Sequence, residues 1–147
     1  MKQRQNIPEL LHDLSLIHEN RITNYSHVLQ HSNHLDLDLR KIIVNMMEES
    51  RLFQYDLEAQ KSRLDGVTIG KPGAVYQHWK IQQKQFDATP RQPFLVSCET
   101  EQSTLRDTYE YALQNDALDD ITRSLIDDQL QTLDAGLDHM QKYLDAL

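Results

Sequence analysis

The sequence contains few of the residues that interrupt helices or cross-link a chain. Among its 147 residues are only 4 Gly, 4 Pro and 1 Cys. So little Gly and Pro argues against a loop-rich or β-rich architecture. One cysteine excludes an internal disulfide, which agrees with a reducing compartment. No apolar run approaches the roughly 20 residues that a membrane-spanning helix needs, so no transmembrane segment is expected.

Positive charge is also scarce. The chain carries 15 Lys and Arg against 23 Asp and Glu, a formal net charge of −8, and its basic residues are scattered. Clustered basic side chains bind phosphate groups, so we expect neither a nucleic-acid nor a membrane partner. The segment from Met1 to Asn6 is basic, but the apolar segment and cleavage site of a secretory signal do not follow it. We therefore expect a cytoplasmic protein.

The composition and the spacing of the apolar residues are typical of one helical domain over residues 1–147. Apolar residues make up 39% of the chain and charged residues 26%, as in globular proteins whose helices each keep a solvated face. The apolar residues recur at alternating spacings of three and four, which is the period of a helix packed on one side. This period predicts long helices at about 7–31, 35–64, 90–114 and 118–146, and a short one at about 74–86.

Local signals support these helices. Asn6-Ile7-Pro8-Glu9 begins the first, with a capping Asn followed by Pro and Glu in the first turn. The apolar stripe of this helix includes two polar residues, His18 and Arg21. In the second helix we expect Leu52 beside the inward stripe. Gly136 is the one weak helix former in the last helix, and it would allow the close approach of a neighbour.

The connection between the second and third long helices is the longest. Gly66, Gly70, Pro72 and Gly73 end the second helix, and about 25 residues separate it from the third. A connection of this length can return along the whole bundle, whereas the other two connections are short. The sequence therefore predicts an all-α four-helix bundle with a long crossover that carries a short helix. Trp79 on that short helix is expected to cover the flank of the bundle, with self-association as the alternative role.

The order of several short motifs resembles a known bacterial family. They are Leu11-His12-Asp13-Leu14 leading to Tyr25, Phe53 with Asp56-Leu57, Trp79, and Cys98-Glu99 leading to Tyr109. This arrangement resembles the ferritin-like four-helix bundles catalogued as domain of unknown function 2383. The resemblance implies a ferritin-like four-helix bundle, and Gln129 matches a Gln of the last helix in the family. His18, Ile22 and Gln102 stand where the family has Cys, Glu and Glu.

One polar cluster is expected inside the bundle. It consists of one or two residues from each long helix: His18, Glu49, Cys98, Gln102 and Gln129. A buried hydrogen-bond network that fixes the register of the helices explains these residues, and we favour this interpretation. His18, Glu49 and Cys98 also offer the nitrogen, carboxylate and thiolate ligands that suit zinc. This second interpretation stays open.

Other candidates for metal sites are weaker. His27, His31 and His34 share one face at the C-terminal end of the first helix. They would bind a divalent ion at the surface, or they are there because histidine interacts favourably with the negative end of the helix dipole. A dimetal centre of the ferritin type needs two Glu-x-x-His motifs. The chain has one, Glu9 to His12, and it lies at a helix end.

These observations favour a non-catalytic structural or interaction module, stress-related by analogy with the resembled family alone. It would have no cofactor and would bind a protein partner or a second copy of itself around Trp79. A metal-binding bundle holding zinc or iron is the alternative hypothesis, and a ferritin-like oxidoreductase is the least favoured one.

Overall fold

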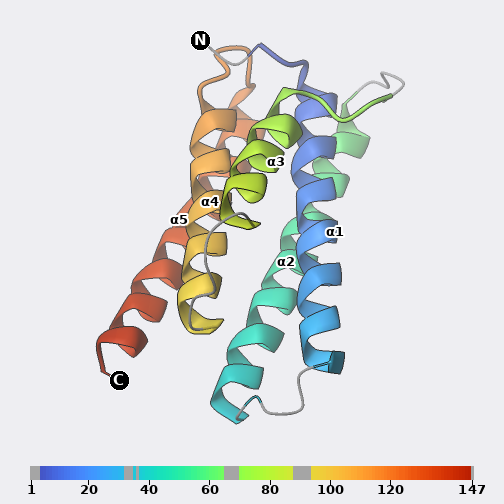
Figure 1. Ribbon diagram of the computed structural model, residues 1–147. Coiled ribbons are helices and arrows are strands. Elements are labelled where there is room, and N and C mark those ends of the chain that lie inside the picture. Colours follow the sequence, from blue (N-terminus) through green and yellow to red (C-terminus); the bar gives the residue numbers. More distant parts are fainter. Residues whose placement is uncertain (1–3, 32–34, 36, 65–69, 88–93, 147) are drawn as a thin grey trace.

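The computed structural model describes residues 4–31, 35, 37–64, 70–87 and 94–146. Within these residues the chain is helical and has no strand, which confirms the all-α prediction. The helices are α1 (Ile7–His31), α2 (Leu37–Arg63), α3 (Ala74–Asp87), α4 (Phe94–Leu113) and α5 (Asp120–Asp145) (Figure 1). The predicted ranges hold to within a few residues. The third long helix is predicted to begin at about residue 90, and residues 90–93 lie outside the described residues.

The long helices form two antiparallel pairs. α1 packs against α2 and α4 packs against α5, while α2 and α5 meet on the far side (Figure 1). The crossover brings the chain back along the bundle, so that α4 runs in the same direction as α2. α3 is part of this crossover and packs against both α1 and α4. The structure is thus a helical bundle with a helix-bearing crossover, and its ferritin-like character stays a prediction.

Side chains cap the helix starts as the sequence predicts for α1. The Asn6 Oδ1 atom accepts a hydrogen bond from the Glu9 backbone N–H at 2.9 Å, and the Asn6 amide donates to the Glu9 carboxylate at 3.2 Å. At the start of α5 the Asp119 carboxylate accepts from the Thr122 backbone N–H at 3.1 Å. Each cap satisfies a backbone donor that the helix itself leaves unpaired.

The start of α3 is capped from another helix. Asp13 of α1 is fully buried, and its carboxylate accepts from the backbone N–H groups of Gly73 at 3.0 Å and Tyr76 at 3.2 Å. The Gln5 side chain donates to the same carboxylate at 2.6 Å. A buried negative charge is favourable at a helix N-terminus, where the dipole is positive. Asp13 therefore fixes α3 against α1.

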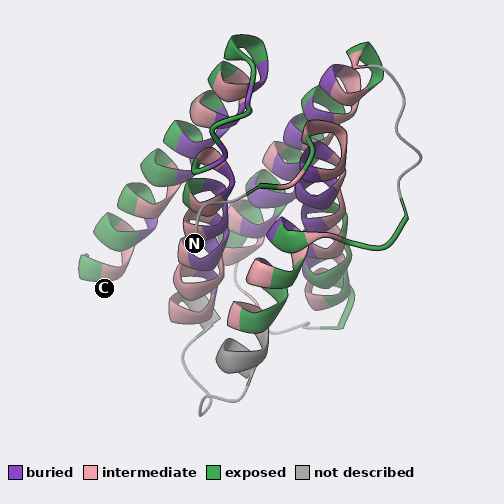
Figure 2. Cartoon of the chain, turned by 90° about the horizontal axis from the view of Figure 1, so that it is seen from above, coloured by how far each residue is buried: buried purple, intermediate pink, exposed green. Residues whose placement is uncertain are grey.

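Two separate apolar cores fill the bundle. We call the first the closed half, because α3 covers it with Val75 and Trp79. Its buried residues come from all five helices and the α4–α5 connection, and Figure 2 shows how the buried faces turn inward. They are Leu10, Leu11, Leu14, Ile17, Phe53, Leu57, Val75, Trp79, Leu105, Tyr109, Ala112, Leu118, Ile126, Leu130 and Leu133.

The second core lies toward the other end of the bundle, beyond the end of α3. Its buried residues are Tyr25, Ile43, Met46, Met47, Cys98 and Met140. We call it the open half, because none of its residues comes from α3. Four of these six residues contain sulfur. Unbranched methionine side chains fill irregular spaces well, so this core is suited to a looser geometry than the first.

One expectation about apolar residues is wrong. Leu52 does not lie beside the inward stripe, since 66% of its surface is exposed on α2. Trp79 covers the flank of the bundle from α3, as predicted, and it is only 5% exposed there. A single-residue shift around a helix turns a side chain by about 100°, so residues at the border of a stripe are the hardest to assign.

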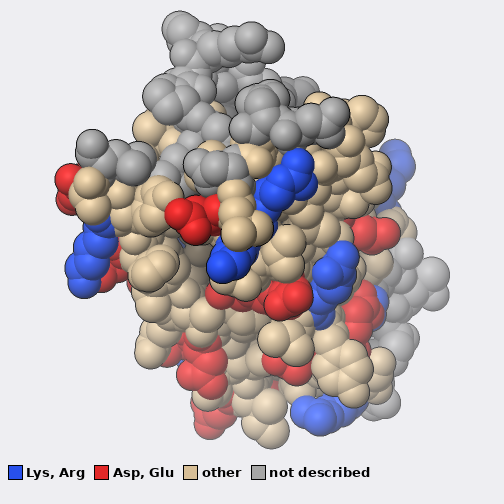
Figure 3. Space-filling view, turned by 90° about the horizontal axis from the view of Figure 1, so that it is seen from below, with Lys and Arg blue, Asp and Glu red and all other residues tan. Residues whose placement is uncertain are grey.

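The surface agrees with the composition. On the face seen in Figure 3, basic and acidic side chains are interspersed and the Lys and Arg residues do not gather into one patch. None of the described helices combines the length and the apolar character that crossing a membrane requires.

Candidate functional site

A chain of hydrogen bonds centred on His18 links four helices. His18 Nε2 lies 2.7 Å from the Tyr109 hydroxyl, and His18 Nδ1 lies 3.0 Å from Ser50 Oγ. The Tyr109 hydroxyl donates to Gln129 Oε1 at 2.6 Å, and the Gln129 amide donates to the Phe53 carbonyl at 3.2 Å. The contacts therefore run from α1 to α2, α4 and α5.

These contacts determine the tautomer of His18. Tyr109 gives its single proton to Gln129, so its oxygen accepts the proton carried by His18 Nε2. His18 Nδ1 is then unprotonated and accepts from Ser50. Burial and, to a smaller extent, the positive charge of Arg21 lower the pKa of His18 to about 3. His18 is therefore a neutral imidazole with both nitrogen atoms engaged.

Arg21 lies one turn further along α1 and is 3% exposed. Its guanidinium donates to the Glu101 carboxylate, to Gln102 Oε1 and, at 3.1 Å, to Ser50 Oγ. The Gln102 amide donates in turn to the Leu133 carbonyl at 3.2 Å. Burial lowers the pKa of Arg21, but the attraction to Glu101 together with smaller contributions from Tyr25 and Glu49 outweighs it, and the pKa lies above its ordinary value. The cation is therefore held in its charged form.

Ser50 joins the two sets of contacts, because its hydroxyl accepts from Arg21 and donates to His18. The result is one continuous network across the bundle, between the closed half and the open half. We call it the polar layer; it consists of His18, Arg21, Ser50, Glu101, Gln102, Tyr109 and Gln129.

Cys98 and Glu49 lie on opposite flanks of the bundle. Cys98 borders a cavity of about 160 Å³ between α1, α3 and α4. Glu49 borders a second cavity, of about 360 Å³, which lies between α2 and α5. Arg21 lines the first cavity and Gln102 lines the second, so their mutual contact forms part of the wall between them.

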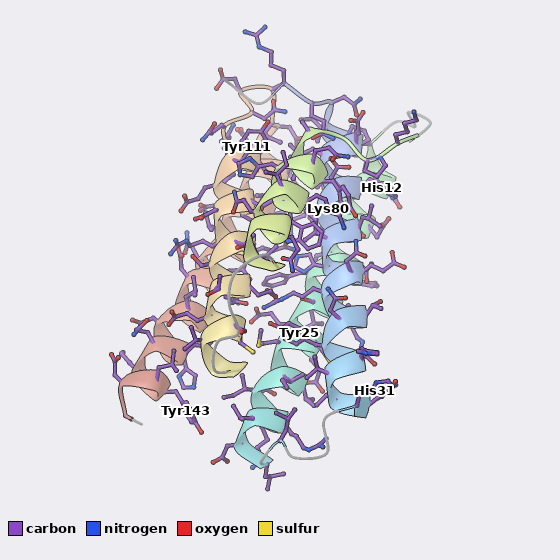
Figure 4. The ribbon with its side chains drawn as sticks, viewed as in Figure 1. His12, Tyr25, His31, Lys80, Tyr111 and Tyr143 are labelled. Carbon is purple, nitrogen blue, oxygen red and sulfur yellow. The ribbon has the colours of Figure 1, made fainter. Side chains whose placement is uncertain are left out.

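Both side chains have shifted protonation equilibria. Burial raises the pKa of the Cys98 thiol to about 12, against a smaller lowering by the neighbouring Tyr25 hydroxyl. Figure 4 shows Tyr25 in the space between α4 and the α1–α2 pair. Burial also raises the pKa of Glu49, and the charge of Arg21 opposes that shift. A thiol with so high a pKa is a poor nucleophile at neutral pH.

The polar cluster expected from the sequence is brought together only in part. His18, Gln102 and Gln129 belong to the polar layer, as the network interpretation predicts. Glu49 joins this layer at its edge through a hydrogen bond with Gln102, whereas Cys98 borders the cavity on the other flank. His18 has used both ring nitrogens. Within the part of the chain that the structure describes, no three His, Cys, Asp or Glu side chains are grouped to hold a metal ion. Zinc or iron binding stays a prediction.

The structure describes two of the three histidines predicted to form a metal clip at the surface. The His27 and His31 rings stack with their centres 4.1 Å apart, and His31 Nδ1 lies 3.0 Å from the His27 carbonyl. His34, the third predicted member of this metal clip, lies outside the described residues.

Sequence reasoning missed most partners of the network. Arg21 gave the clearest signal, since a charged residue on an apolar stripe is rarely buried without a partner. Tyr109 was on the expected stripe of its helix, but nothing in the spacing joined it to His18. Ser50 and Glu101 gave no signal in the sequence. They contact Arg21 across helices, at separations of 29 and 80 positions along the chain.

Comparison of the chain with protein-family models, with curated proteins and with solved structures finds no match. The resemblance to domain of unknown function 2383 therefore stays a prediction from the motifs, and the functional argument depends on the geometry above.

Proposed function

We propose that this protein is a non-catalytic interaction module that associates through the outward face of α2. The observation that carries the proposal is the position of the exposed apolar side chains. Six large ones are exposed among the described residues, and four of them belong to α2. These four are Leu37, Val44, Leu52 and Tyr55, with exposed fractions between 39% and 74%.

The four side chains share one face of the helix. Together with Lys41 and Glu48 they follow spacings of four, three, four, four and three, which keeps them on a narrow stripe. Isolated exposed apolar residues are common and need no explanation, whereas a continuous stripe on one helix favours a binding surface. Trp79 is buried, so the surface proposed here replaces the one expected around that residue.

The charges on the stripe favour a second copy of the chain as the partner. Lys41 and Glu48 are equally far along the helix from the point between Val44 and Asn45. If two α2 helices pair in antiparallel directions about a two-fold axis at that point, each Lys41 faces the Glu48 of the other copy. Leu37 then faces Leu52, and Val44 lies beside its own copy. Apolar and charged residues are therefore complementary in a single register.

The interior supports a non-catalytic role. The side chains of the polar layer are engaged with one another, with His18 held neutral and Arg21 held charged. A general base needs a pKa near the working pH, and a nucleophile needs an activating neighbour. His18 and Cys98 have pKa values shifted far from that range, in the directions that make them unreactive.

Sedimentation velocity over a range of protein concentrations tests the association. We expect a reversible dimer for the natural chain and a monomer for Val44→Arg, which brings two positive charges together at the axis. Lys41→Glu should weaken the dimer about tenfold through like-charge pairs, and adding Glu48→Lys in the same chain should restore it. Ile121→Arg, on an exposed isoleucine of α5, is the matched control. A natural chain that stays monomeric at all concentrations contradicts the proposal.

A metal-binding bundle with His18, Glu49 and Cys98 as ligands is the alternative predicted from the sequence, and it would require these side chains to leave the contacts described above. The test is the metal content of untagged protein that has met neither a metal resin nor a chelator. About one zinc or iron per chain, lost in His18→Leu but kept when His27 and His31 are replaced, would support it. Metal-free protein whose melting temperature does not change with added zinc would exclude it.

A further inference from the structure

The cavity between α1, α3 and α4 has the properties of a small-molecule site. It measures about 160 Å³ and lies against Cys98 and Tyr25 of the open half. Its remaining apolar walls come from three helices and are formed by Ile17, Val28, Trp79 and Leu105. It is distinct from the outward face of α2, none of whose four stripe residues lines it.

The size of the cavity limits the ligand. An apolar cavity of about 150 Å³ in a protein core takes up one benzene molecule. The present cavity therefore has room for a single six-membered ring with one small substituent. Trp79 and Tyr25 supply aromatic surfaces from α3 and α1, and an aromatic ring gains from edge or offset contacts with such walls.

The charges around the cavity favour a neutral ligand. Arg21 and Glu101 are the two charged residues that line it, and they are paired with each other. The Arg21 guanidinium is held further by Gln102 and Ser50. A charged ligand would have to break this pairing or enter without a counter-ion, and burying an unpaired charge is costly.

One polar atom beside the cavity lacks a partner. Gln83 of α3 lines the cavity, and its Oε1 atom is buried with no hydrogen-bond donor in reach among the described residues. An unsatisfied buried carbonyl costs about 1–3 kcal/mol. A ligand O–H or N–H group would satisfy it.

We propose that this cavity binds a neutral, single-ring aromatic molecule that carries one hydrogen-bond donor, of the phenol class. The ring packs between Trp79 and the α1 side chains, and its hydroxyl donates to Gln83 Oε1. For a ligand of so few atoms, a dissociation constant on the order of 0.1–1 mM is expected.

Calorimetric titration with phenol and with toluene tests both parts of the proposal. Toluene has the same ring but no donor. Trp79 is the only tryptophan, so its fluorescence reports occupancy of the cavity directly. Gln83→Met keeps the length of the side chain and removes the acceptor. It should weaken phenol binding about five- to tenfold and leave toluene binding unchanged.

A cavity-filling variant locates the ligand. Val28→Phe places a ring in the space that the ligand would occupy, and it should abolish binding of both molecules. Ile121→Phe, at an exposed position on α5, is the matched control and should bind both normally. The melting temperature of each variant shows that it is folded. Absence of heat and of any Trp79 fluorescence change at millimolar phenol overturns the proposal. Binding that survives Val28→Phe, or equal losses of phenol and toluene in Gln83→Met, also overturns it.

Discussion

The two ends of the bundle are built from the same four long helices, yet they pack differently. In the closed half, Leu, Ile and aromatic side chains from every helix meet under α3. In the open half the core is small and sulfur-rich, and cavities of about 160 and 360 Å³ border it. α3 covers only one end of the space between α1 and α4 (Figure 1), and the 160 Å³ cavity lies where Trp79 and Gln83 of α3 face these two helices. The 360 Å³ cavity lies on the other flank of the bundle, between α2 and α5.

The polar layer marks the border between these ends, and breaking it should have the largest effect. Arg21→Met leaves the Glu101 carboxylate without its partner in a largely buried position. We expect a loss of about 4–5 kcal/mol in the free energy of unfolding, measured by urea denaturation. The double variant Arg21→Met with Glu101→Gln should recover at least half of it. A loss below about 1 kcal/mol in the single variant would mean that the layer does not hold the two ends together.

A pair of truncations compares the two cores directly. Leu14→Ala empties a fully buried position in the closed half and should cost about 3–4 kcal/mol. Met46 lies in the open half and borders the 360 Å³ cavity. Met46→Ala should therefore remove fewer packing contacts than Leu14→Ala. We expect about half the cost, in the same denaturation assay. Equal costs would show that the two cores are equally well packed.

The protonation of His18 gives an effect of about 2 kcal/mol. Its pKa is about 3 in the folded protein and about 6.5 when unfolded, so between these values only the unfolded chain binds the proton. Stability should therefore fall as the pH is lowered from 6.5 to 5, by about 1.4 kcal/mol per pH unit. His18→Gln should lack this contribution, whereas His139→Gln, at an exposed position, should keep it. The same slope in all three proteins would assign the effect to other groups.

Gly136 gives the smallest expected effect. A Cβ atom at this position would lie 2.9 Å from the Gln102 amide nitrogen, which is held by the Leu133 carbonyl. Gly136→Ala gains about 1 kcal/mol in helix propensity, but it displaces a buried side chain of the polar layer. We expect a net loss of about 1 kcal/mol and a faster amide exchange in the open half. A stabilised variant would show that Gln102 can move without cost.

The sequence predicted much of the fold and little of the connections inside it. Apolar periodicity located the long helices, and Asn6 with Glu9 marked the start of α1. Gly136 was correctly expected at a close approach. Asp13, by contrast, was not recognised as the cap of α3, because its partners Gly73 and Tyr76 lie 60 and 63 positions away. A local sequence pattern does not indicate contacts between residues so far apart in the chain.

The candidate site divides in the same way. The residue types on the inward stripes follow from helix period alone, so His18, Gln102 and Gln129 were expected inside. Which of them meet depends on the rotation and offset of each helix relative to its neighbours. Because of those offsets, Cys98 and Glu49 border separate cavities, and His18 forms hydrogen bonds with Ser50 and Tyr109.

The amino-acid sequence by itself determined an all-α chain with helices near their observed bounds and a connection long enough to cross the bundle. Helix period and caps are local properties, set by residues within a few turns of one another. Only the tertiary structure decided that Trp79 is core, that α2 has an apolar outer stripe and that α3 covers one half of the bundle. These features depend on which surfaces meet across large sequence separations, where burial and hydrogen-bond partners are fixed by packing rather than by neighbouring residues.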